Sequence, residues 1–124
     1  MASIDGDALA TDDAYRAAVV DLLGVLAYGE LMAFERLAAD AALAPTIDDE
    51  AQLAGMAAAE FRHFSRLRDR LVEIGADPAA AMQPFRAPLE RFHEMTAPSD
   101  WLEGLVKAYV GDGIGVDFYR EIAT

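Results

Sequence analysis

The chain contains no cysteine, which excludes disulfide bonds, thiolate metal sites and cysteine nucleophiles. Basic residues are also scarce: Lys and Arg total 10 against 22 Asp and Glu, which gives a formal net charge of −12. A chain this acidic lacks the positive surface that binds phosphate backbones, and this argues against nucleic acid as a partner. The same surplus of carboxylates can attract cations.

Neither a leader nor a membrane helix is predicted. Residues 1–10 carry Asp5 and Asp7 but no basic residue, unlike a secretory signal, and we expect them to form a flexible tail. The most apolar stretch, residues 19–34, is interrupted by Asp21 and Glu30. It falls short of the roughly 20 clean apolar residues that a membrane helix needs. We therefore expect a cytoplasmic protein that does not contact a membrane.

Proline is absent from residues 11–44, where alanine and leucine dominate. This predicts a long helix that Thr11 or Asp12 caps and that Pro45 ends. A second helix is predicted over residues 48–74, with Gly75 as its stop signal. Because only residues 45–47 link the two, they should form an antiparallel hairpin.

Four prolines, at positions 78, 84, 88 and 98, interrupt the segment that follows. We expect an ordered crossover there, with at most a short helix over residues 89–95. Ser99 then caps a predicted third helix that continues to the end of the chain. The sequence thus predicts an all-α fold in which residues 11–124 form one domain with three main helices.

Acidic residues and a histidine interrupt the apolar stripe of each predicted helix. Glu30 occupies one position in the first stripe, Glu60 and His63 occupy two in the second, and Asp112 occupies one in the third. Glu60 and His63 are three residues apart, so they project from one face of a helix. The stripes comprise residues 19, 23, 26, 30, 33 and 37; residues 53, 56, 60, 63, 67, 71 and 74; and residues 102, 105, 109, 112, 116, 119 and 123.

These interruptions fall at one level of the predicted bundle. Glu30 lies fifteen residues before Pro45 and Glu60 fifteen residues after it, so both are about 22 Å from the turn at ~1.5 Å per residue. A third helix parallel to the second would bring Asp112 to a similar height. We therefore predict that Glu30, Glu60, His63 and Asp112 converge.

Carboxylates buried together repel one another and lose hydration, and a bound cation offsets both costs. Oxygen and imidazole ligands without sulfur favour iron or manganese, with zinc as another option. Two alternatives stay open. Arg62 or Arg66 could neutralise the acids by turning inward, or Asp112 could lie on a surface face. His93, in the crossover, is interpreted as structural or exposed.

Four segments of the chain carry a family resemblance. They are Tyr28-Gly29-Glu30-Leu31, Ala58-Ala59-Glu60-Phe61-Arg62-His63-Phe64, Trp101-Leu102-Glu103 and Lys107-Ala108-Tyr109-Val110-Gly111-Asp112-Gly113. These segments resemble the ferritin-like superfamily of di-iron carboxylate proteins. More narrowly, they are similar to actinobacterial ferritin-like proteins related to the tRNA hydroxylase that acts on a prenylated, methylthiolated adenosine.

The resemblance implies a ferritin-like four-helix bundle with a long crossover between its second and third helices. It implies a di-iron site held by Glu30, Glu60, His63 and Asp112 in an oxygen-activating oxidase or hydroxylase. From the convergence of the acids we hypothesise that Glu60 bridges the two metals, and the same donors suit manganese or a mixed pair. The fourth helix of that pattern is missing here. We expect a further C-terminal segment or a second subunit to complete the bundle, and a small molecule or modified base as substrate. The alternative is a non-catalytic helical oligomerisation module whose metal site is degenerate.

Overall fold

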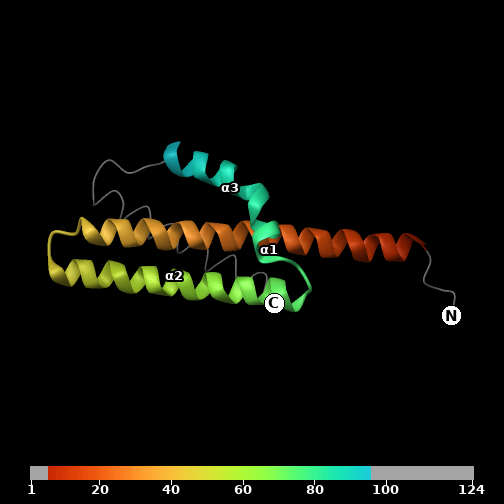
Figure 1. Cartoon of the computed structure of the whole chain (residues 1–124), viewed down its shortest axis with the longest axis horizontal. Coiled ribbons are helices and arrows are strands. Elements are labelled where there is room, and N and C mark those ends of the chain that lie inside the picture. Colours follow the sequence, from red (N-terminus) through yellow and green to blue (C-terminus); the bar gives the residue numbers. More distant parts are fainter. Residues whose placement is uncertain (1–5, 96–124) are drawn as a thin grey trace.

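The computed structural model describes the backbone of residues 6–95 and the side chains of residues 12–95. These residues form three helices: α1 (Gly6–Ala42), α2 (Ile47–Glu73) and α3 (Pro78–Met95). Helices α1 and α2 run antiparallel along each other, and α3 lies across α1 (Figure 1). The predicted all-α class and the antiparallel hairpin are therefore confirmed. The predicted third helix, from Ser99 onward, lies outside the described residues.

Helix α2 begins and ends close to its predicted limits because both of its ends carry strong local signals. Thr46 caps the first turn, where its hydroxyl accepts a hydrogen bond of 3.1 Å from the backbone N–H of Asp49. At the other end Gly75 adopts a φ of +80°. The N–H of Gly75 then donates to the carbonyl of Val72, and the N–H of Ala76 donates to that of Leu71. This pattern is the Schellman motif that glycine permits.

Helix α1 begins at Gly6, so the predicted start at Thr11 is too late and Thr11 lies inside the helix. Residues 12–42 of α1 are long and apolar enough, by length and composition alone, to cross a membrane. A core helix of a water-soluble protein passes the same test. The expectation that this chain does not contact a membrane stays a prediction.

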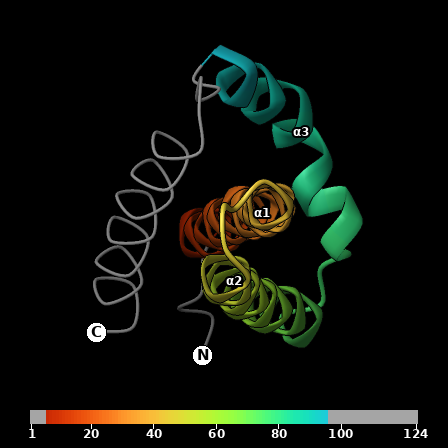
Figure 2. The ribbon, with the colours of Figure 1, turned by 90° about the vertical axis from the view of Figure 1, so that its left-hand side faces the viewer.

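Helix α3 corrects the prediction of a largely non-helical crossover. It spans residues 78–95 although Pro84 and Pro88 lie inside it. Pro78 occupies the first helical position, where a missing N–H costs nothing. The internal prolines remove hydrogen bonds and bend a helix without always ending it. The α3 ribbon changes direction along its length and curves around α1 (Figure 2).

The apolar core falls into two clusters along the α1–α2 hairpin. The cluster nearer the turn is built from alanine and leucine of the two helices. The cluster farther from the turn adds Phe64 of α2 and Ala81 of α3. The buried members are Leu37, Ala41, Leu53 and Ala57 near the turn, and Leu23, Ala27, Phe64, Leu67, Leu71 and Ala81 farther away.

Helix α3 approaches α1 closely at Gly24. A β-carbon placed on Gly24 would lie 2.8 Å from the carbonyl carbon of Ala81 and closer still to its oxygen. Glycine is therefore required here because the backbone of α3 occupies the space of a side chain. By contrast, a β-carbon on Gly55 of α2 would contact nothing within 4 Å.

We predict that Gly24→Ala lowers the free energy of unfolding by about 1–3 kcal/mol, because α3 must move away from α1. The matched control Gly55→Ala should raise stability by up to ~1 kcal/mol through helix propensity. Urea denaturation followed by circular dichroism measures both values. Equal effects of the two substitutions would contradict the close contact between α1 and α3.

Candidate metal centre

Glu30, Glu60 and His63 lie between the two apolar clusters of the hairpin. On α1, Glu30 lies between Ala27, which belongs to the cluster farther from the turn, and Leu37, which belongs to the cluster near the turn. On α2, Glu60 and His63 follow Ala57, the last buried residue of the cluster near the turn. The antiparallel arrangement brings Glu30 level with Glu60, as their equal distance from Pro45 predicts, and His63 follows Glu60 by about one helical turn.

The three side chains are close enough to share one ion. Each offers a carboxylate oxygen or an imidazole nitrogen, and these atoms lie within 4.8 Å of one another. The Nδ1 atom of His63 is 3.8 Å from an oxygen of Glu30 and 3.7 Å from an oxygen of Glu60. Glu60 is buried, with 6% of its surface exposed, while Glu30 and His63 are half-buried.

This geometry fits a metal ion. Ligand atoms that bind one ion at about 2.0–2.2 Å lie roughly 3–4.3 Å apart, and the two measured N–O distances fall in that range. Two carboxylates and an imidazole are ligands that iron, manganese and zinc accept. A cation would also offset the repulsion between two carboxylates held in a largely apolar interface.

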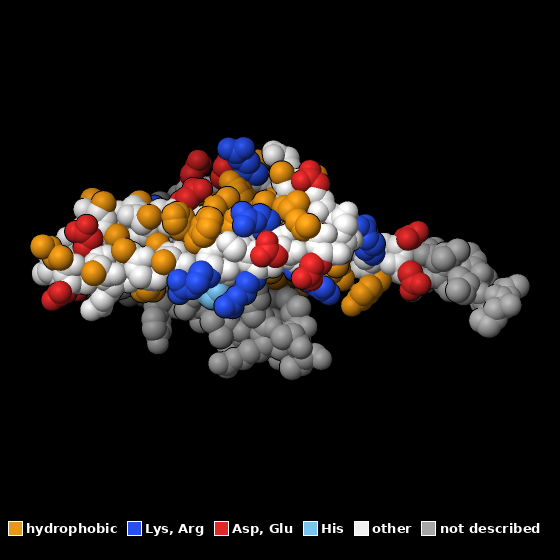
Figure 3. Space-filling view, turned by 60° about the horizontal axis from the view of Figure 1, so that its bottom comes forward, with side chains coloured by type: hydrophobic (Ala, Val, Ile, Leu, Met, Phe, Trp, Pro, Cys, Tyr) orange, Lys and Arg blue, Asp and Glu red, His pale blue; other side chains and the backbone are white. Residues whose placement is uncertain are grey.

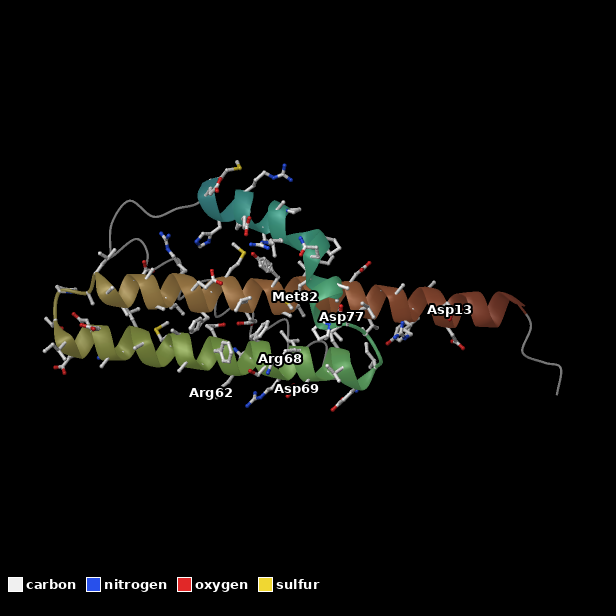
Figure 4. All side chains as sticks on the ribbon, in the orientation of Figure 1. Asp13, Arg62, Arg68, Asp69, Asp77 and Met82 are labelled. Carbon is white, nitrogen blue, oxygen red and sulfur yellow. The ribbon has the colours of Figure 1, made fainter. Side chains whose placement is uncertain are left out.

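Arg62 and Arg66 do not turn inward, so the first alternative to a metal ion is not supported. Both side chains are exposed, whereas Glu60 on the same helix is buried. In Figure 4 Arg62 and Asp69 lie along the edge of α2 that faces away from α1. Asp112, the fourth predicted ligand, lies outside the described residues, so its convergence with the other three stays a prediction.

A polar contact holds α3 on another face of α1. The Tyr28 hydroxyl of α1 donates a hydrogen bond of 2.9 Å to Glu90 Oε1 of α3, and Arg86 Nε donates to the same oxygen at 3.2 Å. These two donors hold the pKa of Glu90 below its usual range. Burial, together with the hydrogen bond to Glu90, raises the pKa of Tyr28.

Beside this contact is a cleft of about 290 Å³ that the sequence did not predict. Glu90 and His93 of α3 line it and repeat the Glu-x-x-His spacing of Glu60 and His63. This repeated spacing is visible in the sequence and could have indicated that Glu90 and His93 share a helix face. The prediction of a largely non-helical crossover in this segment hid that indication. Within the part of the chain that the structure describes, only Glu30, Glu60 and His63 form a cluster that could hold a metal ion. The cleft is lined by Tyr28, Met32, Glu35, Arg36, Ala39, Glu90, His93 and Glu94.

An antiparallel helical hairpin that directs two carboxylates and an imidazole into its interface is typical of ferritin-like helical proteins. The sequence model of one family, described as the ferritin-like domain of actinomycetes, matches residues 13–124. The chain therefore belongs to this family of actinomycete ferritin-like domains. No curated protein matches the chain. The predicted superfamily is confirmed, whereas the narrower relation to the tRNA hydroxylase is not shown.

We predict that Tyr28→Phe raises the pKa of Glu90 toward its ordinary value, because one of its two hydrogen-bond donors is lost. Stability that comes from a lowered carboxyl pKa is present above the unfolded-state value and disappears as pH falls through the folded-state value. Wild type should therefore lose its stability advantage over Tyr28→Phe on acidification.

NMR titration of the Glu90 carboxyl carbon measures the change in pKa. Melting temperatures recorded between neutral pH and pH 3 measure the change in relative stability. An unchanged Glu90 titration in the variant would show that Tyr28 does not donate this hydrogen bond in solution.

Proposed function

We propose that this ferritin-like domain binds iron through Glu30, Glu60 and His63 and belongs to an oxygen-activating oxidase or hydroxylase. The supporting observation is the approach of two carboxylates and one imidazole to within 4.8 Å at a single level of the hairpin. Two carboxylates held close together in a largely apolar interface repel each other, and a cation bound between them offsets that repulsion.

Each of the three side chains has a distinct part in holding the ion. Glu30 and Glu60 supply oxygen ligands from two helices, so binding would fasten α1 to α2 at the level between the two apolar clusters. His63 supplies a ring nitrogen and sits between the acids. Bound iron would supply the redox chemistry for oxidising or hydroxylating an organic substrate. The apolar clusters on either side limit access of water to the buried Glu60.

The remaining ligands of a two-metal site belong to the proposal as well. Asp112 is the predicted acid from the third helix, and we propose that a further segment or a second subunit supplies the fourth-helix ligands. A small organic molecule suits the charge of the chain better than an intact tRNA does, because a net charge of −12 repels phosphates. We propose a cytoplasmic protein, and manganese or a mixed pair could replace iron in the same donor set.

A second candidate function is a helical oligomerisation module with a degenerate metal site. The observation that favours it is exposed apolar surface on the described helices: Leu43, Ile47 and Met95 are 71%, 83% and 85% exposed, and a partner would cover them. Under this alternative, metal would leave stability unchanged. Glu60→Gln would leave the stability of the metal-free protein unchanged or raised, because it removes one of two neighbouring negative charges.

We predict that ferrous iron, added without oxygen, binds the wild-type chain and raises its melting temperature. At a free iron concentration 100 times the Kd, the stabilisation would be about 2.7 kcal/mol. Glu60→Ala should abolish the shift and lower the iron content, because it removes a carboxylate from the cluster. Iron analysis after desalting and differential scanning calorimetry measure the two effects.

Glu50→Ala is the matched control, since Glu50 is an exposed acid on the same helix and lies outside the cluster. This variant should bind iron as wild type does. Equal iron content and equal shifts for wild type and Glu60→Ala would remove the metal-site proposal and leave the oligomerisation module.

A further inference from the structure

The outer face of α2, opposite Glu60, separates charge along its length. Asp48 lies in the first turn, and Arg62 and Arg66 lie in the second half. Asp48 and Arg66 are eighteen residues apart, which is about five full turns of an α-helix, so they project in the same direction. All three side chains are exposed. Figure 3 shows basic side chains on the forward face with acidic side chains beside them, in a chain whose net charge is strongly negative.

Between Asp48 and Arg62 the same face carries only small residues. Ala51, Gly55 and Ala58 follow one another at intervals of four and three residues, and all are exposed. Small residues let a neighbouring helix approach closely, because interaxial distance depends on the side chains at the contact. Ile47 begins this face and is 83% exposed, so it offers apolar surface that a partner would cover.

We propose that the outer face of α2, defined by Asp48, Ala51, Gly55, Ala58, Arg62 and Arg66, docks a second copy of this chain with its α2 antiparallel to the first. Asp48 lies nine residues before Ala57 and Arg66 nine residues after it. A two-fold axis at that level therefore places Asp48 of each copy opposite Arg66 of the other, and the small residues cross at the centre. Such an isologous interface makes the same ion pair twice.

Charge also selects this arrangement over its rivals. A parallel pairing in register would place Arg66 against Arg66 and Asp48 against Asp48, and like charges repel. Asp69 and Glu73, the other acids on this side of α2, lie beyond the start of the partner's α2 in the antiparallel register. Within the described residues neither Arg62 nor Arg66 forms an internal ion pair, whereas Arg70 pairs with Glu73 at 2.9 Å. The surface is distinct from the metal centre, which faces α1.

The test is sedimentation velocity of the full chain over a dilution series at fixed ionic strength. Wild type should form a dimer that dissociates on dilution. Arg66→Glu should weaken association at least about tenfold, because both ion pairs become repulsive. Asp48→Arg should weaken it similarly. The double variant, with Asp48→Arg and Arg66→Glu together, should restore dimerisation because each pair is then reversed.

Arg91→Glu is the control for net charge, because Arg91 is exposed on α3 and makes the same charge change away from this face. It should leave association unchanged. The chain has no cysteine, so Ala58→Cys should give a disulfide-linked dimer on mild oxidation, while Ala87→Cys on α3 should not. A monomeric wild type, or a dimer that the double variant fails to restore, would overturn the proposal.

Discussion

The packing of α1 against α2 depends on how two carboxylates and an imidazole are accommodated within their apolar interface. Glu30, Glu60 and His63 occupy positions that the helical pattern assigns to apolar residues, and apolar clusters pack on either side of them. Burial of the clusters favours the hairpin, while burial of like charges opposes it at this one level. A cation held by the three side chains would offset the repulsion between the buried charges and would link α1 to α2. Under the proposed function, metal binding would therefore stabilise the hairpin.

The rest of the described structure is arranged around this hairpin. Thr46 and Gly75 fix the limits of α2, and the short turn after α1 sets the register that brings Glu30 level with Glu60. Helix α3 packs on α1 without adding a side chain to the metal cluster, held by the close contact at Gly24 and by the hydrogen bond from Tyr28 to Glu90. The metal cluster, the α1–α3 cleft and the outer face of α2 are consequently separate regions that can be altered independently.

The local features were predictable from the sequence because each carries its own signal. The apolar stripe of α2 predicted four of its buried residues, Leu53, Glu60, Leu67 and Leu71, but missed Ala57 and Phe64. Counting residues from Pro45 placed Glu30 beside Glu60. The failures arose where distant contacts decide the structure. Pro84 and Pro88 argued against a helix, yet residues 78–95 are helical and α3 packs on α1. No local pattern showed that Gly24 would meet the backbone of Ala81. The Glu-x-x-His spacing of Glu90 and His93 is visible in the sequence, but it does not show that they lie beside Tyr28, because that depends on how α3 packs on α1.

Anomalous X-ray diffraction at the iron absorption edge would show whether Glu30, Glu60 and His63 hold iron. Crystals grown with ferrous iron should show an anomalous peak about 2.0–2.2 Å from His63 Nδ1 and from an oxygen of each glutamate. A peak that disappears in Glu60→Ala crystals would tie the ion to this cluster. No peak there at full iron loading, or a peak only in the cleft beside Glu90 and His93, would contradict the account.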